Sequence, residues 1–315
     1  MSTERNFEVV AVNISEEKGT IKHPVTEVVL DGRGLVGDAH AGLWHRQVSL
    51  LGQTDIDIFA EKLSRPLDPG EFAENISLGG IELAHVSVLD RLHIGDIELE
   101  VTQIGKKCHG DACAIYQATG DCVMPKKGLF ARVIRGGTVR PGDVGRWAPR
   151  PLRAAVLTLS DRAHAKEYAD RSGPRVRDLL IQHFEKTRWH LETTVTVLPD
   201  DPDRLREALL ALRDDGVDLI ITTGGTGVGP RDITPDVVTA IADKQIPGVM
   251  DAIRLKYGIK TPNALLSRSV AAVLGGALVY TLPGSVRAVD EYMAEILGTV
   301  EHLVKMLHGL GHQEP

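Results

Sequence analysis

The sequence predicts two domains of different fold classes, with a boundary near residue 150 that separates residues 1–150 from residues 151–315. The first is predicted to be a compact, mostly-β barrel or sandwich, and the second an α/β domain with a mostly parallel sheet. Short β-rich segments separated by glycine and aspartate turns fill the first half, whereas apolar strands alternate with amphipathic helices in the second. Pro141, Pro149 and Pro151 bracket the connector between them.

The predicted strands of the first domain are short and rich in β-branched residues. They include FEVVAVNI, TEVVLDG, VSVLD and LHIGDIELEVTQIG, and the segment QTDIDIFAEKL is the clearest helix. Their spacing between turn residues is typical of an all-β barrel or sandwich.

In the second domain, continuous apolar strands alternate with helices whose apolar residues recur at helical spacing. The strands are AAVLTLS, TTVTVLP and VDLIITT, and the helices cover residues 172–187, 201–215 and 286–307. Ser172 with Pro174, and Asp201 or Asp203, provide the start signals of the first two helices. The last helix is apolar on more than one face, which favours core packing together with an oligomer contact. Strands without polar alternation indicate a parallel sheet that is covered on both faces.

The composition excludes several classes of function. The 315 residues carry a net charge of −7 and are 43% hydrophobic and 25% charged, which is ordinary for a globular protein. Neither half has the basic excess of a nucleic-acid-binding protein, and no stretch approaches the roughly 18 apolar residues of a membrane span. The start MSTERNFEVVAVNIS does not resemble a signal peptide, and three cysteines do not suggest a disulfide framework. We therefore expect a cytoplasmic protein that binds neither nucleic acid nor membrane.

A glycine-rich loop, TTGGTGVGPRDITPD, follows the predicted strand VDLIITT. Ligands of parallel α/β sheets bind beyond the carboxyl ends of the strands, and successive glycines let backbone N–H groups point at one anion. The generic nucleotide fingerprints do not fit. Pro230 and Arg231 stand where a P-loop requires lysine and a hydroxyl residue, and Pro230 replaces the third glycine of a dinucleotide-binding loop. The residues therefore predict an anion site without choosing the nucleotide.

Asp232 lies within this loop, where its carboxylate would repel a phosphate unless a cation stood between them. This placement indicates Mg²⁺ and nucleotide chemistry. Thr234, Pro235 and Asp236 predict the first turn of a helix, whose N-terminus would add to the anion site. The alternative is that Asp232 and Asp236 only cap that helix.

Polar motifs at the strand ends of this half carry a family resemblance. The motifs SDRA, YADRSGP, LPDD, TTGGTG, RDITPD, LLSRS and LPGS occur in this order, and residues 153–308 resemble the molybdopterin adenylyltransferase family of molybdenum cofactor biosynthesis. The resemblance implies a three-layer α/β domain, usually assembled as a trimer, that binds ATP with Mg²⁺ and the pterin dithiolene molybdopterin. In the implied reaction, the terminal phosphate of molybdopterin attacks the α-phosphorus of ATP and releases pyrophosphate.

The same resemblance implies the residues of the site. Asp200 and Asp232 match the family's two essential aspartates, which we expect to be catalytic and to hold Mg²⁺. The residues expected to bind nucleotide or pterin are Ser160, Asp161, Gly224, Gly225, Thr226, Gly227, Thr234, Asp236, Ser267, Arg268, Pro283, Gly284 and Ser285. No protein nucleophile is needed because the attacking phosphate is already ionised. Catalysis would rest on positioning and on charge neutralisation by metal, loop amides and Arg268 or Arg231.

The first domain contains all three cysteines, at Cys108, Cys113 and Cys122. Their spacing lacks the CxxC pairs of a zinc site, so buried thiols are one interpretation. Basic residues beside Cys108 favour the alternative, a reactive thiol of lowered pKa.

Residues 20–148 resemble the MOSC domain through the motifs GDAHAG, GEFAENISLGGIEL, CAIY and FARVIRGGTVRPGD. The resemblance implies a β-barrel-rich fold that binds the molybdenum cofactor or handles sulfur through one catalytic cysteine. Cys113 best fits that position, and Cys108 is second. Basic residues that would meet the cofactor's phosphate, or else are solvated surface charges, are Arg132, Arg135 and Arg140. Polar residues that serve either the site or the fold are Asp38, His40 and His45.

Together, the two resemblances predict an enzyme of molybdenum cofactor biosynthesis in which the second domain adenylylates molybdopterin. Its partners are ATP, molybdopterin, copies of the same chain and other enzymes of the cofactor. One alternative is molybdate insertion or cofactor maturation without adenylylation. The other is a non-enzymatic carrier that binds and delivers the pterin.

Overall fold

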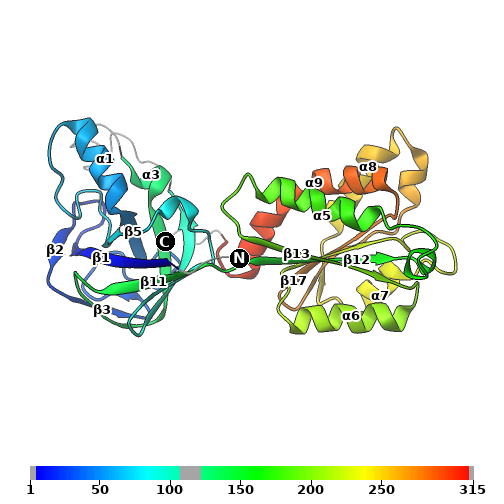
Figure 1. Ribbon diagram of the computed structural model, residues 1–315, viewed down its shortest axis with the longest axis horizontal. Helices are drawn as coiled ribbons and strands as arrows, with labels where there is room; N and C mark the ends of the chain where they lie inside the picture. Colours follow the sequence, from blue (N-terminus) through cyan, green and yellow to red (C-terminus); the bar gives the residue numbers. More distant parts are fainter. Residues whose placement is uncertain (1–4, 107–121, 312–315) are drawn as a thin grey trace. The chain divides into compact units, whose positions relative to one another are not determined.

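The computed structural model describes residues 5–106 and 122–311 (Figure 1). The chain divides between Arg150 and Pro151 into two compact units. We call them the barrel unit, whose described residues are 5–106 and 122–150, and the α/β unit, residues 151–311.

Within the described residues, seven strands of the barrel unit close into a barrel. They follow the order β11-β7-β8-β9-β5-β6-β1, and β1 closes the ring because it pairs antiparallel with both β6 and β11. All neighbours are antiparallel except β5 and β6. The strands are β1 (Arg5–Ile14), β5 (Val48–Gly52), β6 (Ile76–Gly79), β7 (Arg91–Ile94), β8 (Ile97–Ile104), β9 (Leu129–Arg135) and β11 (Val144–Ala148). Of the two architectures that the sequence predicts, the barrel is therefore confirmed.

Shorter elements surround this barrel. Strand β2 pairs with β1, and β10, β3 and β4 form a small separate sheet. Their bounds, with those of the helices, are β2 (His23–Val25), β3 (Val28–Asp31), β4 (Gly34–Leu35), β10 (Gly137–Val139), α1 (Gln53–Leu63), η1 (Leu83–His85) and α3 (Met124–Lys127). Helix α1 coincides with the segment QTDIDIFAEKL that the sequence predicts as helical.

Alternating burial along the strands fills the barrel with apolar side chains. On β1, Phe7 and Val9 are buried whereas Glu8 is exposed, which is the period of two expected of a strand with one interior face. Val9, Leu50 and Leu99 are fully buried members of this core. Each such side chain contributes roughly 1.5–3 kcal/mol relative to an exposed position. The barrel interior is therefore a packed hydrophobic core.

The α/β unit is built on a six-stranded sheet in the order β13-β12-β14-β17-β16-β15. Strands β13, β12, β14 and β17 are parallel, whereas β16 and β15 are antiparallel to their neighbours. The bounds are β12 (Leu152–Leu159), β13 (Leu191–Leu198), β14 (Leu219–Thr223), β15 (Lys244–Gln245), β16 (Ala271–Leu274) and β17 (Ala277–Leu282). The sheet is mixed, so the expected parallel character holds for four strands only. The two-residue turn Gly275–Gly276 joins β16 to β17, and so short a turn connects only antiparallel strands.

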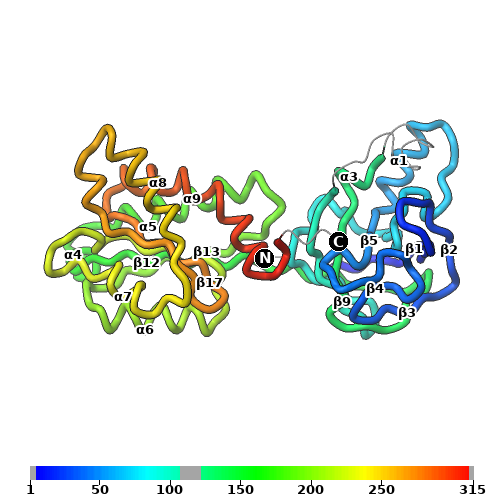
Figure 2. Tube along the Cα trace, turned by 180° about the vertical axis from the view of Figure 1, so that it is seen from behind, coloured from blue at the N-terminus to red at the C-terminus, as the bar shows by residue number. Residues whose placement is uncertain are grey.

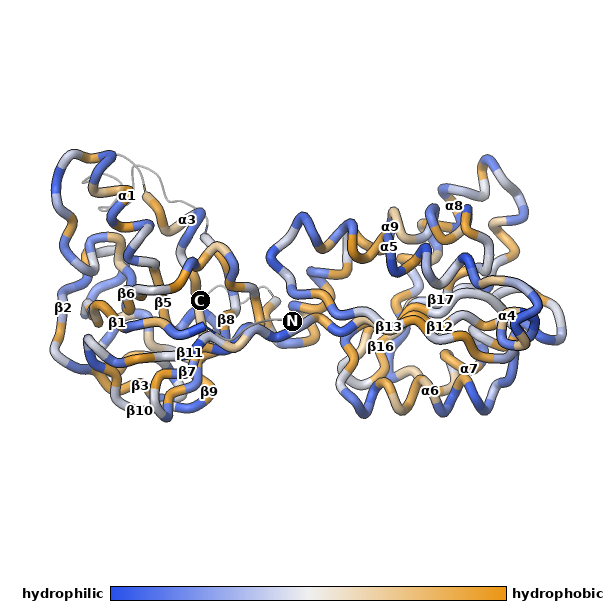
Figure 3. The backbone as a smooth tube through the Cα atoms, viewed as in Figure 1, coloured by the Kyte–Doolittle hydropathy of each residue, from blue (hydrophilic) through white to orange (hydrophobic). Residues whose placement is uncertain are grey.

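Helices cover both faces of this sheet and make three layers (Figure 1). Helices α5 (Ser172–Phe184), α8 (Pro247–Gly258) and α9 (Val286–Leu307) lie on one face, and α6 (Pro202–Asp214) and α7 (Thr234–Ile241) on the other. The view from behind shows the same division (Figure 2). Apolar and polar stretches alternate along α5 and α6 (Figure 3), and Leu205 and Leu209 of α6 are fully buried against the sheet.

Both predicted helix starts are confirmed. Asp201 caps α6, because its side chain accepts hydrogen bonds from the N–H groups of Asp203 and Arg204. Helix α5 begins at Ser172, and Oδ1 of Asp170 accepts hydrogen bonds from the N–H groups of Ser172 and Gly173 at 3.0 and 3.2 Å. Among the described residues, no helix is long and apolar enough to cross a membrane.

Candidate functional site

The glycine loop begins where β14 ends and packs closely against two neighbouring segments. Gly224 and Gly225 have φ angles of +104° and +63°, which favour glycine. A Cβ atom on Gly224 would lie 2.4 Å from the carbonyl oxygen of Leu159, and one on Gly225 would lie 2.6 Å from Oγ1 of Thr234. Thr234 also donates from Oγ1 to the Gly224 carbonyl at 3.0 Å. The glycines are therefore required by the fit of the loop between β12 and α7.

Asp232 folds back over the same loop. Its Oδ2 accepts a hydrogen bond from the N–H of Gly229 at 2.8 Å, and a Cβ atom on Gly227 would lie 2.8 Å from this oxygen. The capping position of α7 is Ile233, and no side chain supplies a hydrogen bond there. Neither Asp232 nor Asp236 is therefore a side-chain cap of α7, so the alternative that they only cap this helix is wrong.

Arg268 fastens the loop to the segment that precedes β16. Its Nε donates to the Gly227 carbonyl at 2.7 Å, Nη1 donates to Oδ1 of Asp236 at 2.7 Å, and Nη2 donates to the Asp232 carbonyl at 2.5 Å. The backbone N–H of Arg268 donates to the Thr226 carbonyl at 2.9 Å. All three guanidinium nitrogens thus hold the loop and its following helix.

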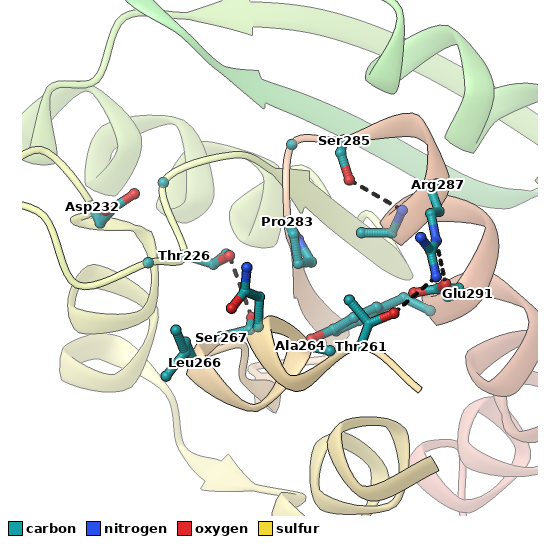
Figure 4. A pocket seen from close by; sticks show the side chains of 16 residues that line it. Thr226, Asp232, Thr261, Ala264, Leu266, Ser267, Pro283, Ser285, Arg287 and Glu291 are labelled. Carbon is teal, nitrogen blue, oxygen red and sulfur yellow. Dashed lines mark hydrogen bonds and ion pairs between the residues drawn. The ribbon is translucent and has the colours of Figure 1, made fainter. Parts of the chain in front are cut away.

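A pocket of about 450 Å³ lies beside this loop (Figure 4). The loop, the β17–α9 connection, the 3-10 helix η3 (Pro262–Leu266) and the first turns of α9 line it. The sequence-predicted residues that line it are Gly225, Thr226, Gly227, Asp232, Ser267, Pro283, Gly284 and Ser285. Four other predicted residues, Gly224, Thr234, Asp236 and Arg268, contact the loop without lining the pocket.

The remaining predicted residues form a second polar group at the ends of β12 and β13. The N–H of Asp161 donates to Oδ2 of Asp200 at 3.1 Å, and the N–H of Asp200 donates to Oδ1 of Asp161 at 2.9 Å. Arg231 of the glycine loop reaches Oδ2 of Asp161 at 3.3 Å, which ties this group to the loop. Ser160 accepts from the N–H of Ala163 and caps the short helix α4 (Asp161–His164). These residues do not line the pocket.

Half of the pocket wall consists of residues that sequence reasoning missed. They are Thr261, Asn263, Ala264, Leu266, Arg287, Ala288, Glu291 and Tyr292. Four of them lie in the first two turns of α9. They form two pairs four positions apart, Arg287 with Glu291 and Ala288 with Tyr292, and residues at this spacing are neighbours on a helix surface. Because α9 starts directly after the LPGS motif, its first two turns lie next to the site. The position of this motif in the sequence therefore indicates the residues of these turns. The segment before and through η3 carries no comparable signal.

In the barrel unit, polar residues near the motif GDAHAG form a buried network. The buried Lys22 ammonium donates to Asp38, and Oδ2 of Asp38 also accepts from Nδ2 of Asn75 at 3.0 Å and from the N–H of Ser15 at 3.1 Å. Burial lowers the pKa of Lys22. Burial acts to raise the pKa of Asp38, but its hydrogen bonds to His40 and Lys22 outweigh this effect and hold that pKa well below its usual range. Asp38 thereby joins segments that are distant in the sequence.

The cysteine prediction falls largely outside the described residues. Cys108 and Cys113 lie there, whereas Cys122 is described and is buried. The three arginines predicted to meet a phosphate each have a carboxylate within 4 Å: Arg132 with Glu100, Arg135 with Glu98, and Arg140 with Glu27.

Comparison with known proteins finds two family models in this chain. Residues 155–302 match a probable molybdopterin binding domain, and residues 37–145 match the MOSC domain. Both resemblances stated from the sequence motifs are therefore confirmed.

Several characterised proteins are similar to the chain. A molybdenum cofactor biosynthesis bifunctional protein of Synechococcus elongatus is 37% identical over 159 residues, which are 50% of this chain and 48% of that protein. A molybdopterin adenylyltransferase of Haemophilus influenzae is 36% identical over 141 residues, 44% of this chain and 70% of that protein. The chain thus spans about half the length of the bifunctional relative. The crystal structure of a molybdopterin biosynthesis enzyme from Thermus thermophilus matches with 33% identity and a TM-score of 0.46, covering 50% of this chain and 97% of that one.

A MOSC domain followed by an α/β unit that matches a probable molybdopterin binding domain places the chain among proteins of molybdenum cofactor biosynthesis. The chain belongs to the family of molybdenum cofactor biosynthesis proteins that includes the molybdopterin adenylyltransferases.

Proposed function

We propose that the α/β unit is a molybdopterin adenylyltransferase that uses ATP with Mg²⁺. The observation that carries the proposal is the pocket lined by Gly225–Gly227 and Asp232, at the carboxyl end of β14. Ligands of open α/β sheets bind at this edge, and backbone N–H groups of a glycine loop suit phosphate. Membership of the family supports the same reaction, because relatives in it are named molybdopterin adenylyltransferases.

The two aspartates fit the role of magnesium ligands. Within the described residues, Oδ1 of Asp232 and Oδ1 of Asp200 have no hydrogen bond, whereas the second oxygen of each is held by a backbone N–H. No group of three or more His, Cys, Asp or Glu side chains in the described part of the chain is placed to hold a metal ion. Mg²⁺ suits a site with two aspartates, since this ion is usually held by one or two carboxylates together with substrate phosphates and water. When bound, it neutralises charge on the reacting phosphates.

The remaining residues act by positioning. Arg268 and Thr234 hold the loop through hydrogen bonds to its carbonyl groups, and Arg231 with Asp161 links the loop to Asp200. The attacking phosphate is ionised before it binds, so no protein group has to remove its proton. The rate enhancement would come from alignment of two anionic substrates and from preorganised charge. For the barrel unit we propose that it binds the cofactor or handles sulfur; the role of Cys113 in this stays a prediction.

The test is incubation of the full chain with molybdopterin, Mg²⁺ and α-labelled ATP, followed by detection of adenylylated pterin. Wild type should form the product, and Asp232→Asn should lower kcat by at least about 100-fold, as expected for loss of a preorganised charge at the reacting centre. Asp178→Asn is the matched control, because Asp178 is exposed on α5 and, among the described residues, forms its ion pair with the neighbouring Arg177. Tight pterin binding without product would instead support a carrier. Product formation unaffected by Asp232→Asn would remove Asp232 from the site.

A further inference from the structure

The pocket has two chemically different ends (Figure 4). The glycine loop with Asp232 and Thr226 lies on one side, and Thr261, Arg287 and Glu291 lie on the other. At the first end we expect an anion, because the backbone of a glycine-rich loop suits phosphate. The second offers a carboxylate that is fixed by an arginine, which is an unsuitable place for a phosphate because Glu291 would repel it.

Glu291 is held in one orientation by its neighbours. Nε of Arg287 donates to Oε1 of Glu291 at 2.9 Å, and Nη2 of the same arginine donates to Oγ1 of Thr261 at 2.9 Å. The Glu291 side chain is only 19% exposed, whereas that of Arg287 is 70% exposed. Within the described residues Oε2 of Glu291 has no hydrogen bond. The pocket therefore contains a half-buried, oriented carboxylate with a free acceptor.

The chemistry of this carboxylate selects the kind of ligand. A carboxylate only accepts hydrogen bonds, so its partner must supply N–H or O–H groups. The 2-amino-4-oxopyrimidine ring of a pterin carries an amino group and a ring N–H side by side, which match the two oxygens of a carboxylate. Adenine places a ring nitrogen lone pair beside its amino group, and this lone pair would face the carboxylate.

The walls of this end suit a flat heterocycle. Ala264 lies beside Thr261 at this end (Figure 4), and Ala288 and Tyr292, from the same turns of α9 as Arg287 and Glu291, also line the pocket. A volume of about 450 Å³ lies within the range of small-molecule sites.

We propose that Glu291 recognises the aminopyrimidinone edge of the pterin ring and that Arg287 is the positioning residue that orients it. The inference rests on the proposed function for its choice of a pterin, because guanine presents the same edge. The pocket then has a phosphate end at the glycine loop and a pterin end at the start of α9. Glu291 would disfavour adenine at the pterin end.

A pair of simple ligands isolates this contact. Pterin and lumazine share the bicyclic ring and the 4-oxo group, but position 2 carries an amino donor in pterin and an oxygen acceptor in lumazine. Binding of each to the full-length protein is measured by fluorescence titration, with AMP and GMP as further ligands. Wild type should bind pterin about 10- to 100-fold more tightly than lumazine, as expected for hydrogen bonds to a charged group. Glu291→Gln should abolish this preference and leave AMP binding unchanged.

Two further variants separate recognition from a structural role. Glu295→Gln is the matched control, since Glu295 lies one turn further along α9 and pairs with Lys256 and Tyr257 outside the pocket. It should keep the pterin preference. Arg287→Ala should reduce that preference several-fold without reversing it, because the carboxylate remains but loses its orientation.

An equal preference for pterin over lumazine in wild type and Glu291→Gln would overturn the inference. Tighter binding of GMP than of pterin, with the same dependence on Glu291, would reassign the end to a guanine nucleotide and overturn it as well. The measurement uses neither ATP nor turnover. A protein that fails to adenylylate molybdopterin but distinguishes pterin from lumazine through Glu291 would therefore refute the proposed function and support this inference.

Discussion

Glu74 in the barrel unit is a fully buried carboxyl group with incomplete hydrogen bonding. Its Oε1 accepts from the N–H of Gly70 at 2.7 Å and from Oγ of Ser77 at 3.1 Å, whereas Oε2 has no partner within the described residues. Burial raises the pKa of Glu74 and outweighs these hydrogen bonds, which act in the opposite direction. The folded protein therefore favours the protonated side chain more than the unfolded chain does.

This asymmetry predicts a pH-dependent stability. Because the folded pKa lies above the ordinary value of 4.5 for a glutamate, the contribution of Glu74 is fully present below that pH and is lost as the pH rises through the folded pKa. Glu74→Gln removes the titration, so the melting temperature of wild type should fall relative to the variant as the pH is raised from about 4 to about 8. Calorimetry of the full chain measures this difference. Glu8→Gln, at an exposed position on β1, should follow wild type; parallel curves for wild type and Glu74→Gln would contradict the prediction.

At the scale of elements, the conformation of the glycine loop depends on segments that come after it in the chain. Arg268 precedes β16, yet its guanidinium holds the carbonyls of Gly227 and Asp232 and the carboxylate of Asp236. The planar fork of arginine can bond three acceptors at once, which a lysine ammonium on a flexible chain does poorly. The loop is thus shaped jointly by β14, α7 and the segment before β16.

Arg268→Lys should therefore weaken the loop without unfolding the unit. Loss of two charge-assisted hydrogen bonds predicts a decrease in kcat/KM of about 10-fold or more and faster amide hydrogen exchange in residues 224–233. Arg213→Lys is the control, because Arg213 forms an exposed pair with its neighbour Asp214. Unchanged exchange and activity in Arg268→Lys would show that the loop holds its conformation by itself.

At the scale of the whole molecule, the two units have separate hydrophobic cores. One core is formed by the barrel strands, and another by residues of β12, β14, β16 and β17 with helices α6 and α7. The pocket and all its lining residues belong to the α/β unit. Domains with their own cores commonly fold alone.

A fragment of residues 151–315 should fold and bind Mg²⁺-ATP and molybdopterin without the barrel unit. Its adenylylation rate should lie within about threefold of that of the full chain, since autonomous domains retain their sites. The measurement is the labelled-ATP assay, combined with circular dichroism to establish folding. A folded fragment with no activity would show that the barrel unit contributes directly to the reaction.

The sequence predicted features that depend on neighbouring residues better than features formed by segments that are distant in the chain. The bounds of α1 and α9, the cap at Asp201 and the position of the glycine loop follow from short-range signals such as apolar spacing, proline and capping residues. Four strands of the sheet are parallel, in line with the predicted mostly parallel sheet, whereas β16 is antiparallel because the short Gly275–Gly276 turn joins it to β17. The wall formed by Thr261 and Glu291 was missed because these residues approach the loop only after the chain has folded.

The sequence by itself determined the two-domain organisation, the position of the glycine loop with Asp232 in it, and the resemblance to molybdenum cofactor proteins. These rest on residues adjacent in the chain, whose backbone preferences and spacing are local. Only the tertiary structure decided which strand ends meet, that Arg268 holds the loop, and that Arg287 orients Glu291 at the far end of the pocket. The physical reason is that a pocket is formed by side chains from distant segments, and their approach depends on strand order and helix packing.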